Sequence, residues 1–201
     1  MLFSGRRRYL IFLEREVESS RHQIYFGEAA LALPCIVGNF CMLVAYDPRW
    51  PQMFLAMQEQ LFSVVGASIT AIHHIGSTSV PGLCAKPIID ICIESELYPP
   101  NEMVIAALVQ LGFTHHGEAG VLGRHWFATG NPRTHHLHWC PVKGAIVQAA
   151  LKFRDALRAN PALRNAYANG KVASVQKNQV DGLAYNQDKE PFILQVLMRE
   201  D

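Results

Sequence analysis

Apolar side chains recur at helical spacing in several parts of the chain. Met53, Met57, Leu61 and Val64 lie three or four positions apart, which predicts an amphipathic helix that Gly66 ends. The same spacing recurs towards the C-terminus, where three further helices are expected. In all, the pattern predicts helices at 52–65, 101–111, 146–157, 161–174 and 188–198.

Two apolar runs instead have the length and the Ile-rich composition of strands, at 69–75 and 87–94. After them come "FTHHG", "VLGRHWFATG" and "RTHHLHWC", short β-like runs separated by Gly, Asn and Pro. Such punctuation is typical of a meander. The expected fold class is therefore α+β, with a mixed β-sheet, flanking helices and further helices at the C-terminus.

Composition indicates a single soluble domain. The chain has 201 residues, half of them hydrophobic, and a formal net charge of +1. That balance gives no indication of DNA or of an anionic membrane as a partner. Five cysteines form no regular framework, which favours a reducing compartment, and a cytoplasmic location is expected.

The N-terminal part is interpreted as an extension, residues 1–43, that precedes a domain over 44–201. The apolar run after Arg6–Arg8 is too short for a signal peptide, because charged residues follow it directly. Residues 29–46 carry no charge, but Pro34, Gly38 and Asn39 interrupt them, so a membrane span is not expected. Met42 is an alternative start, which leaves open whether the extension belongs to the native protein.

The stretch "HIGSTSVPGLCAKPIIDICIE" carries the clearest candidate chemistry. Gly76 and Ser77 can present a close backbone and a hydroxyl to a phosphate. The stretch has neither a P-loop nor a nucleophile elbow. Strand alternation puts Asp90, Cys92 and Glu94 on one face. A carboxylate within an apolar strand needs a partner, so Asp90 is expected to pair or to bind a metal.

Several segments together resemble the GrpB-like family of bacterial proteins, a branch of the nucleotidyltransferase superfamily. They are "YDPRWPQMF", "HIGSTSVPGLCAKPIIDI", "GRHWFATG", "RTHHLHW" and "FRDALRANP". The resemblance implies a nucleotidyltransferase-like cleft in which Gly76 and Ser77 hold phosphate and Asp90 binds Mg²⁺ or Mn²⁺. The second acid position holds Cys92, a poor ligand for these ions, and Glu94 is the substitute on the same face.

Histidines provide an alternative metal site, for Zn²⁺ instead of Mg²⁺ or Mn²⁺. In "THHLHWC", His136, His138 and Cys140 share one strand face, and two of them together with Asp90 could bind Zn²⁺. In the cleft that the resemblance implies, His136 and His138 are the predicted general bases or phosphate donors, in place of the missing acids, and with Asp90 they are the predicted catalytic residues. Hydrogen-bonded histidines with no such role remain the other interpretation.

Further polar residues complete the predicted phosphate site. Two "Y-x-x-x-K" pairs place Tyr and Lys on one helix face. Beyond Gly76 and Ser77, the predicted phosphate or substrate ligands are Thr78, Lys86, Arg124, Arg133, Lys171 and Lys189.

The expected ligand is a nucleotide or a phosphorylated small molecule, and metal-dependent transfer of a nucleotidyl group is the candidate reaction. The alternative is a non-catalytic binding or accessory domain. Fusions of GrpB-like domains to dephospho-CoA kinase suggest a role linked to coenzyme A. The acceptor and the oligomeric state are left open.

Overall fold

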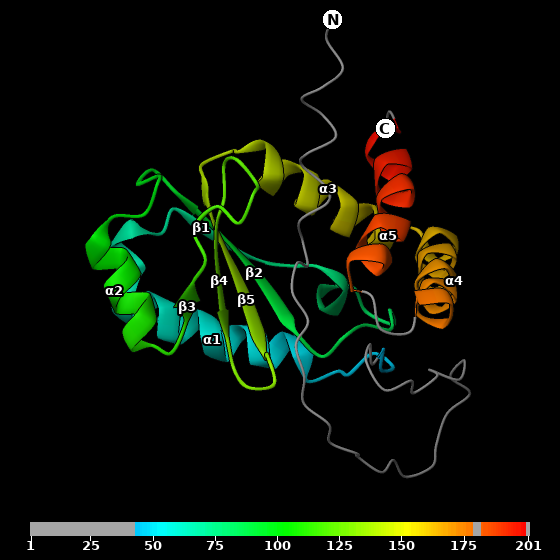
Figure 1. Ribbon diagram of the computed structural model, residues 1–201, viewed down its shortest axis with the longest axis horizontal. Coiled ribbons are helices and arrows are strands. Elements are labelled where there is room, and N and C mark those ends of the chain that lie inside the picture. The colour runs from blue at the N-terminus through cyan, green and yellow to red at the C-terminus, as the bar shows by residue number, and fades with distance from the viewer. Residues whose placement is uncertain (1–42, 179–181, 200–201) are drawn as a thin grey trace, which may run out of the picture.

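The computed structural model describes residues 43–178 and 182–199, and five α-helices and five strands lie within them (Figure 1). The helices are α1 (Trp50–Val65), α2 (Glu102–Gln110), α3 (Ala145–Ala159), α4 (Pro161–Asn178) and α5 (Gly182–Leu197). The strands are β1 (Ala71–Ile75), β2 (Ile89–Ser95), β3 (Thr114–His115), β4 (His125–Thr129) and β5 (His135–Pro141).

The strands form one mixed sheet in the order β1-β2-β5-β4-β3. Only β2 and β5 pair in parallel, and Asp90 of β2 lies opposite His136 of β5 in their register. The other pairs, β1 with β2, β3 with β4 and β4 with β5, are antiparallel. The mixed sheet and the meander through β3, β4 and β5 are thus confirmed.

One face of the sheet carries the main core. Ile89, Ile91 and Ile93 alternate along β2 and are all buried against α1 and α2, together with Leu137 and Trp139 of β5. Helix α2 starts at a capping residue, since Asn101 Oδ1 accepts a hydrogen bond from the Val104 N–H at 3.0 Å. This core fixes which side chains of β2 and β5 turn to the opposite face.

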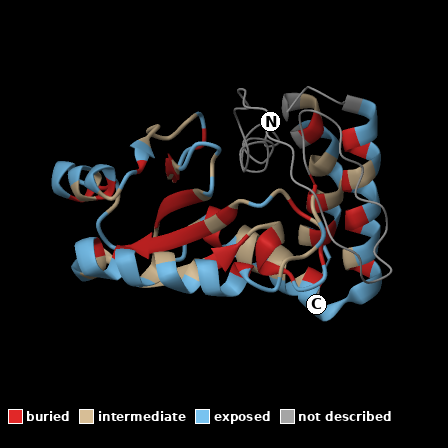
Figure 2. Ribbon diagram, turned by 90° about the horizontal axis from the view of Figure 1, so that it is seen from below, coloured by how far each residue is buried: buried red, intermediate tan, exposed pale blue. Residues whose placement is uncertain are grey.

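The opposite face holds Cys92 and Cys140, which pack with Ile146 and Val147 of α3. Beyond the end of the sheet, α4 and α5 lie side by side (Figure 1). In Figure 2 the ribbon of these helices alternates between buried residues, in red, and exposed residues, in pale blue. A separate apolar cluster, which includes Val80, Leu83, Leu157 and Ile193, packs these helices against the chain that follows β1.

The helix bounds differ from the expectation mainly near the C-terminus. Helix α4 continues to Asn178, and α5 begins at Gly182 and contains Pro191 within it. Of the predicted extension at 1–43, all but Leu43 lies outside the described residues. No helix in the described part of the chain is long and apolar enough to cross a membrane.

Candidate functional site: a pocket at the start of two parallel strands

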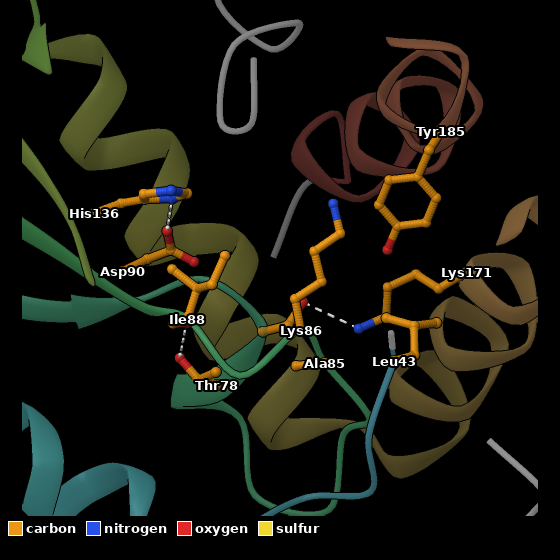
Figure 3. A pocket seen from close by; sticks show the side chains of 10 residues that line it. Leu43, Thr78, Ala85, Lys86, Ile88, Asp90, His136, Lys171 and Tyr185 are labelled. Atoms are coloured by element: carbon orange, nitrogen blue, oxygen red, sulfur yellow. Dashed lines mark hydrogen bonds and ion pairs between the residues drawn. The ribbon is translucent and has the colours of Figure 1, made fainter. Parts of the chain in front are cut away.

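A pocket lies where β2 and β5 begin, between the sheet and the C-terminal helices (Figure 3). Asp90 and His136 are each the second residue of their strand. Helices α4 and α5 contribute Lys171 and Tyr185 on the opposite side. The lining consists of Leu43, Ser77, Thr78, Ala85, Lys86, Ile88, Asp90, His136, Lys171 and Tyr185.

The turn after β1 forms one edge of this pocket. Gly76 has φ 69° and ψ −173°, a backbone conformation that is essentially restricted to glycine. A Cβ atom added there would lie 2.3 Å from Asp90 Oδ2, so only glycine allows the turn to approach this carboxylate. A short 3₁₀ turn, Ser77–Ser79, follows and places Ser77 in the pocket.

Asp90 and His136 contact each other across the two parallel strands. His136 Nδ1 donates a hydrogen bond to Asp90 Oδ1 at 3.1 Å, because a carboxylate oxygen can only accept. His136 is 4% exposed. Its Nε2 atom has no hydrogen-bond partner in the described part of the chain. Asp90 thus has the partner that its place on an apolar strand requires.

Lys171 reaches the turn from α4. Its ammonium donates to Ser77 Oγ at 3.0 Å and, through a shorter bond, to the carbonyl oxygen of Cys84. It also lies 4.9 Å from the ring centroid of Tyr167, one turn earlier in the helix. Lys171 is only 2% exposed, so its charge is held in a fixed position beside Ser77.

A second tyrosine is flanked by two ammonium groups. Lys86 Nζ lies 4.8 Å from the ring centroid of Tyr185, and Lys189 Nζ lies 4.2 Å from it. Lys86 and Tyr185 line the pocket, whereas Lys189 is beside them but outside the lining. The pocket wall on this side is therefore both aromatic and positively charged.

Three arginines that are not among the predicted site residues donate hydrogen bonds to backbone carbonyl oxygens of β1 and of the turn that follows it. Arg154 Nη1 donates to the carbonyl oxygen of His74 at 3.1 Å. Arg158 donates to that of Ser79 from Nε at 3.0 Å and from Nη2 at 2.7 Å. Arg164 Nη1 donates to that of Pro81 at 3.1 Å. The spacing of Arg154 and Arg158, four positions apart on one helix face, was the available signal.

Thr78 lines the pocket, but its hydroxyl is engaged within the protein. It donates to the carbonyl oxygen of Ile88 at 3.2 Å, so His74 Nε2 must donate to it, at 3.0 Å. His74 is also stacked on Phe54, with centroids 4.9 Å apart. Burial, followed by the charges of Arg158 and Arg154, lowers the pKa of His74 to about 4, which keeps the ring neutral.

Glu94, the predicted substitute for the second acid, lies away from the pocket on the same strand face. Its Oε1 accepts from His73 Nε2 at 2.8 Å and its Oε2 accepts from the Lys143 N–H at 2.6 Å. Burial raises the pKa of Glu94, but these bonds outweigh it and the pKa is lowered. Both oxygens of Glu94 thus have partners that hold it at the far end of β2.

Arg124 and His138 are together, but inside the protein rather than in the pocket. Arg124 Nη1 donates to His138 Nδ1 at 3.3 Å, since a guanidinium can only donate. Burial lowers the pKa of Arg124 to about 10 and that of His138 well below its usual value. Arg133 lies over the ring of Trp126, 5.3 Å from its centroid, and also stays outside the pocket lining.

The donors present do not fit the Mg²⁺ or Mn²⁺ site, with two neighbouring acids, that the family resemblance implies. Cys92 is fully buried at the second acid position, with its Sγ 3.9 Å from Cys140 Sγ. Contact with Cys140 and burial raise the pKa of the Cys92 thiol, which keeps it neutral. Within the described residues, no three His, Cys, Asp or Glu side chains are placed to share a metal ion. The second acid position is therefore occupied by a neutral thiol instead of a carboxylate.

Comparison with known proteins decides the family. A profile described as GrpB protein matches residues 41–199. The chain belongs to the GrpB family. Its relatives include protein YqkA of Bacillus subtilis, with 37% identity over 75% of this chain. The crystal structure of the conserved protein GrpB from Enterococcus faecalis superposes with a TM-score of 0.72 at 29% identity, over 78% of this chain and 97% of that one.

Some relatives of this GrpB-family chain are longer proteins. The chain spans 44% of YqkA. It also matches 43% of a dephospho-CoA kinase of Mycolicibacterium paratuberculosis, at 27% identity over 75% of this chain. The matches to the GrpB profile and to the GrpB crystal structure confirm the resemblance to this family that the motifs indicated.

Proposed function

We propose that the pocket of this GrpB-family protein binds a nucleotide or a phosphorylated small molecule. The observation that carries the proposal is the convergence of Ser77 and Lys86, from the segment between β1 and β2, with Lys171 of α4 on one pocket. Two ammonium groups and a hydroxyl beside a glycine turn are the donors that a phosphate group requires.

The hydrogen bonding of Ser77 supports this assignment. Its Oγ accepts from Lys171, so its own hydroxyl proton is left to donate to another oxygen. Gly76 carries no side chain that would block the approach of that oxygen. The turn is held from behind by Arg158 and Arg164, so its donors are pre-organised before a ligand arrives.

The family resemblance favours a nucleotide among phosphate ligands, because the Gly-Ser turn holds nucleotide phosphates in active nucleotidyltransferases. The dephospho-CoA kinases that share this region make a ligand related to coenzyme A the next candidate. Transfer of a nucleotidyl group with a pair of divalent ions needs a second acid. The neutral Cys92 favours the alternative, a binding or accessory domain.

The two lysines beside Tyr185 give a matched test. Binding of pyrophosphate, the four common NTPs and dephospho-CoA is measured by calorimetry, in EDTA and with Mg²⁺ or Mn²⁺. Lys86→Met is expected to weaken binding by about tenfold or more, since a charged hydrogen bond is lost. Lys189→Met removes an ammonium over the same ring but outside the pocket, and is expected to change the Kd by about twofold at most.

Two results would contradict the proposal. One is the absence of binding to any of these probes in any buffer. The other is binding that Lys86→Met leaves unchanged, which would place the ligand elsewhere on the molecule.

A further inference from the structure

We propose that Asp90 is a positioning residue for His136, that His136 Nε2 contacts a phosphate oxygen of the ligand, and that binding therefore needs no divalent metal. The inference rests on the proposed function, because it concerns the same pocket. It departs from the role of metal ligand that the family resemblance implies for Asp90.

The hydrogen bond between the two side chains has a defined direction. Because Asp90 Oδ1 can only accept, the proton at 3.1 Å belongs to His136 Nδ1. That bond fixes the orientation of the imidazole, and the reactive position of the ring is then Nε2. The parallel register of β2 and β5 places both residues opposite each other at the start of their strands.

The other ring nitrogen of His136, Nε2, is the atom that would contact the ligand. It is buried in a residue that lines the pocket, and it has no hydrogen-bond partner among the residues that the structure describes. Buried polar atoms in folded proteins almost always have a partner. A phosphate oxygen of the ligand can be that partner. The hydrogen bond needs one proton between Nε2 and the oxygen, and either atom can be its donor.

Neighbouring residues hold the Asp90–His136 pair in place. Gly76 packs directly over Asp90, where a Cβ atom would meet Oδ2 at 2.3 Å. On the other side, the Trp126 ring meets the His136 ring edge to face, with centroids 5.4 Å apart. Carboxylate and imidazole are thus held from both sides, which is the arrangement expected of a pre-organised binding group.

A metal ion at Asp90 would need ligands that the neighbouring side chains do not offer. A metal at Asp90 would compete with the Nδ1 proton for Oδ1, and its second ligand would have to replace the buried thiol of Cys92. Glu94 cannot serve without losing His73 and the Lys143 N–H. Ser77, Lys86 and Lys171 already supply donors for a phosphate at the pocket, so the ligand's charge is met by the protein.

Two amide substitutions separate the roles of the ring nitrogens. His136→Asn keeps a donor near the Nδ1 position, beside Asp90, and removes Nε2. His136→Gln places an amide near the Nε2 position. With pyrophosphate and ATP as probes in EDTA, His136→Asn is expected to raise the Kd by about tenfold or more, and His136→Gln is expected to restore part of the loss. His135→Asn is the control, since this neighbour on β5 lies outside the pocket lining.

Asp90→Asn tests the positioning role by spectroscopy as well as by affinity. In the wild-type protein, ¹⁵N NMR of the His136 ring is expected to show a protonated Nδ1, and addition of pyrophosphate is expected to shift Nε2. In Asp90→Asn the tautomer is no longer fixed, and the affinity is expected to fall about as much in EDTA as in Mg²⁺.

The outcomes distinguish this inference from the proposed function. Binding that appears only with Mg²⁺, Mn²⁺ or Zn²⁺ and disappears in EDTA would make Asp90 a metal ligand and overturn the inference alone. The same holds if His136→Asn binds as tightly as the wild-type protein. The absence of binding to every probe would overturn the proposed function and this inference together.

Discussion

At the scale of single residues, Gly76 decides whether the turn can lie against Asp90. Gly76→Ala is expected to lower the free energy of unfolding by about 3 kcal/mol or more, because backbone strain adds to a clash with the carboxylate. Gly117→Ala is the matched control. Gly117 also has positive φ, 61°, but a Cβ atom there meets nothing within 4 Å.

The control is expected to cost about 1 kcal/mol, from strain alone. Urea unfolding at neutral pH measures both variants. Equal losses in the two would show that contact with Asp90 adds nothing to the requirement for glycine.

Strand alternation predicted which residues share a face, but not how deep along the strand each one lies. Asp90 and His136 are at the pocket because each is near the start of its strand. His138 is two positions further along the same face and is buried beside Arg124. A shift of two residues is about 6–7 Å along a strand, which is enough to leave the site.

At the scale of elements, the docking of α3 and α4 holds the turn in place. Arg158→Ala removes both hydrogen bonds to the Ser79 carbonyl oxygen. Faster amide hydrogen exchange is then expected at Val80 and Leu83, whose N–H groups bond within this turn. Mass-spectrometric exchange measures it.

Lys152→Ala is the control, since Lys152 also lies on α3 but donates to the Arg199 carbonyl oxygen. Exchange that stays slow around Val80 in Arg158→Ala would mean that apolar packing alone holds the turn.

The elements themselves were largely predictable, because hydrophobic periodicity reflects burial within one helix or strand. The hydrogen bonds that anchor the turn after β1 could not be predicted in the same way. Arg154 and Arg158 look like the exposed face of an amphipathic helix in sequence, and only the packing of α3 against the chain after β1 gives them carbonyl partners. Such contacts join residues about eighty positions apart, so the local spacing of the two arginines shows a shared helix face but not the carbonyl groups that they bind.

At the scale of the whole molecule, buried neutral histidines make stability depend on pH. The unfolded chain binds a proton at His74 below its ordinary pKa of 6.5, whereas the folded protein does so only near a pKa of about 4. Between these values the unfolded state takes up more protons, so stability falls as the pH falls. His138, whose pKa is also lowered by burial, acts in the same direction.

The expected loss from His74 is on the order of 3 kcal/mol by about pH 4. His74→Gln keeps an amide donor for Thr78 and removes the titrating ring, so its stability is expected to fall less steeply between about pH 6.5 and about pH 4.5. Urea unfolding across this range measures the difference. Parallel curves for the two proteins would exclude His74 as a cause of acid sensitivity.

The pocket is built from two structurally separate sources. The sheet supplies Asp90 and His136, while Lys171 and Tyr185 come from helices that pack in a different apolar cluster from the sheet core. Substitutions in α4 and α5 are therefore expected to alter the size and charge of the pocket without disturbing the aspartate–histidine pair. Under the proposed function, this division predicts that changes in the two C-terminal helices alter ligand preference, whereas changes in the sheet alter the binding chemistry itself.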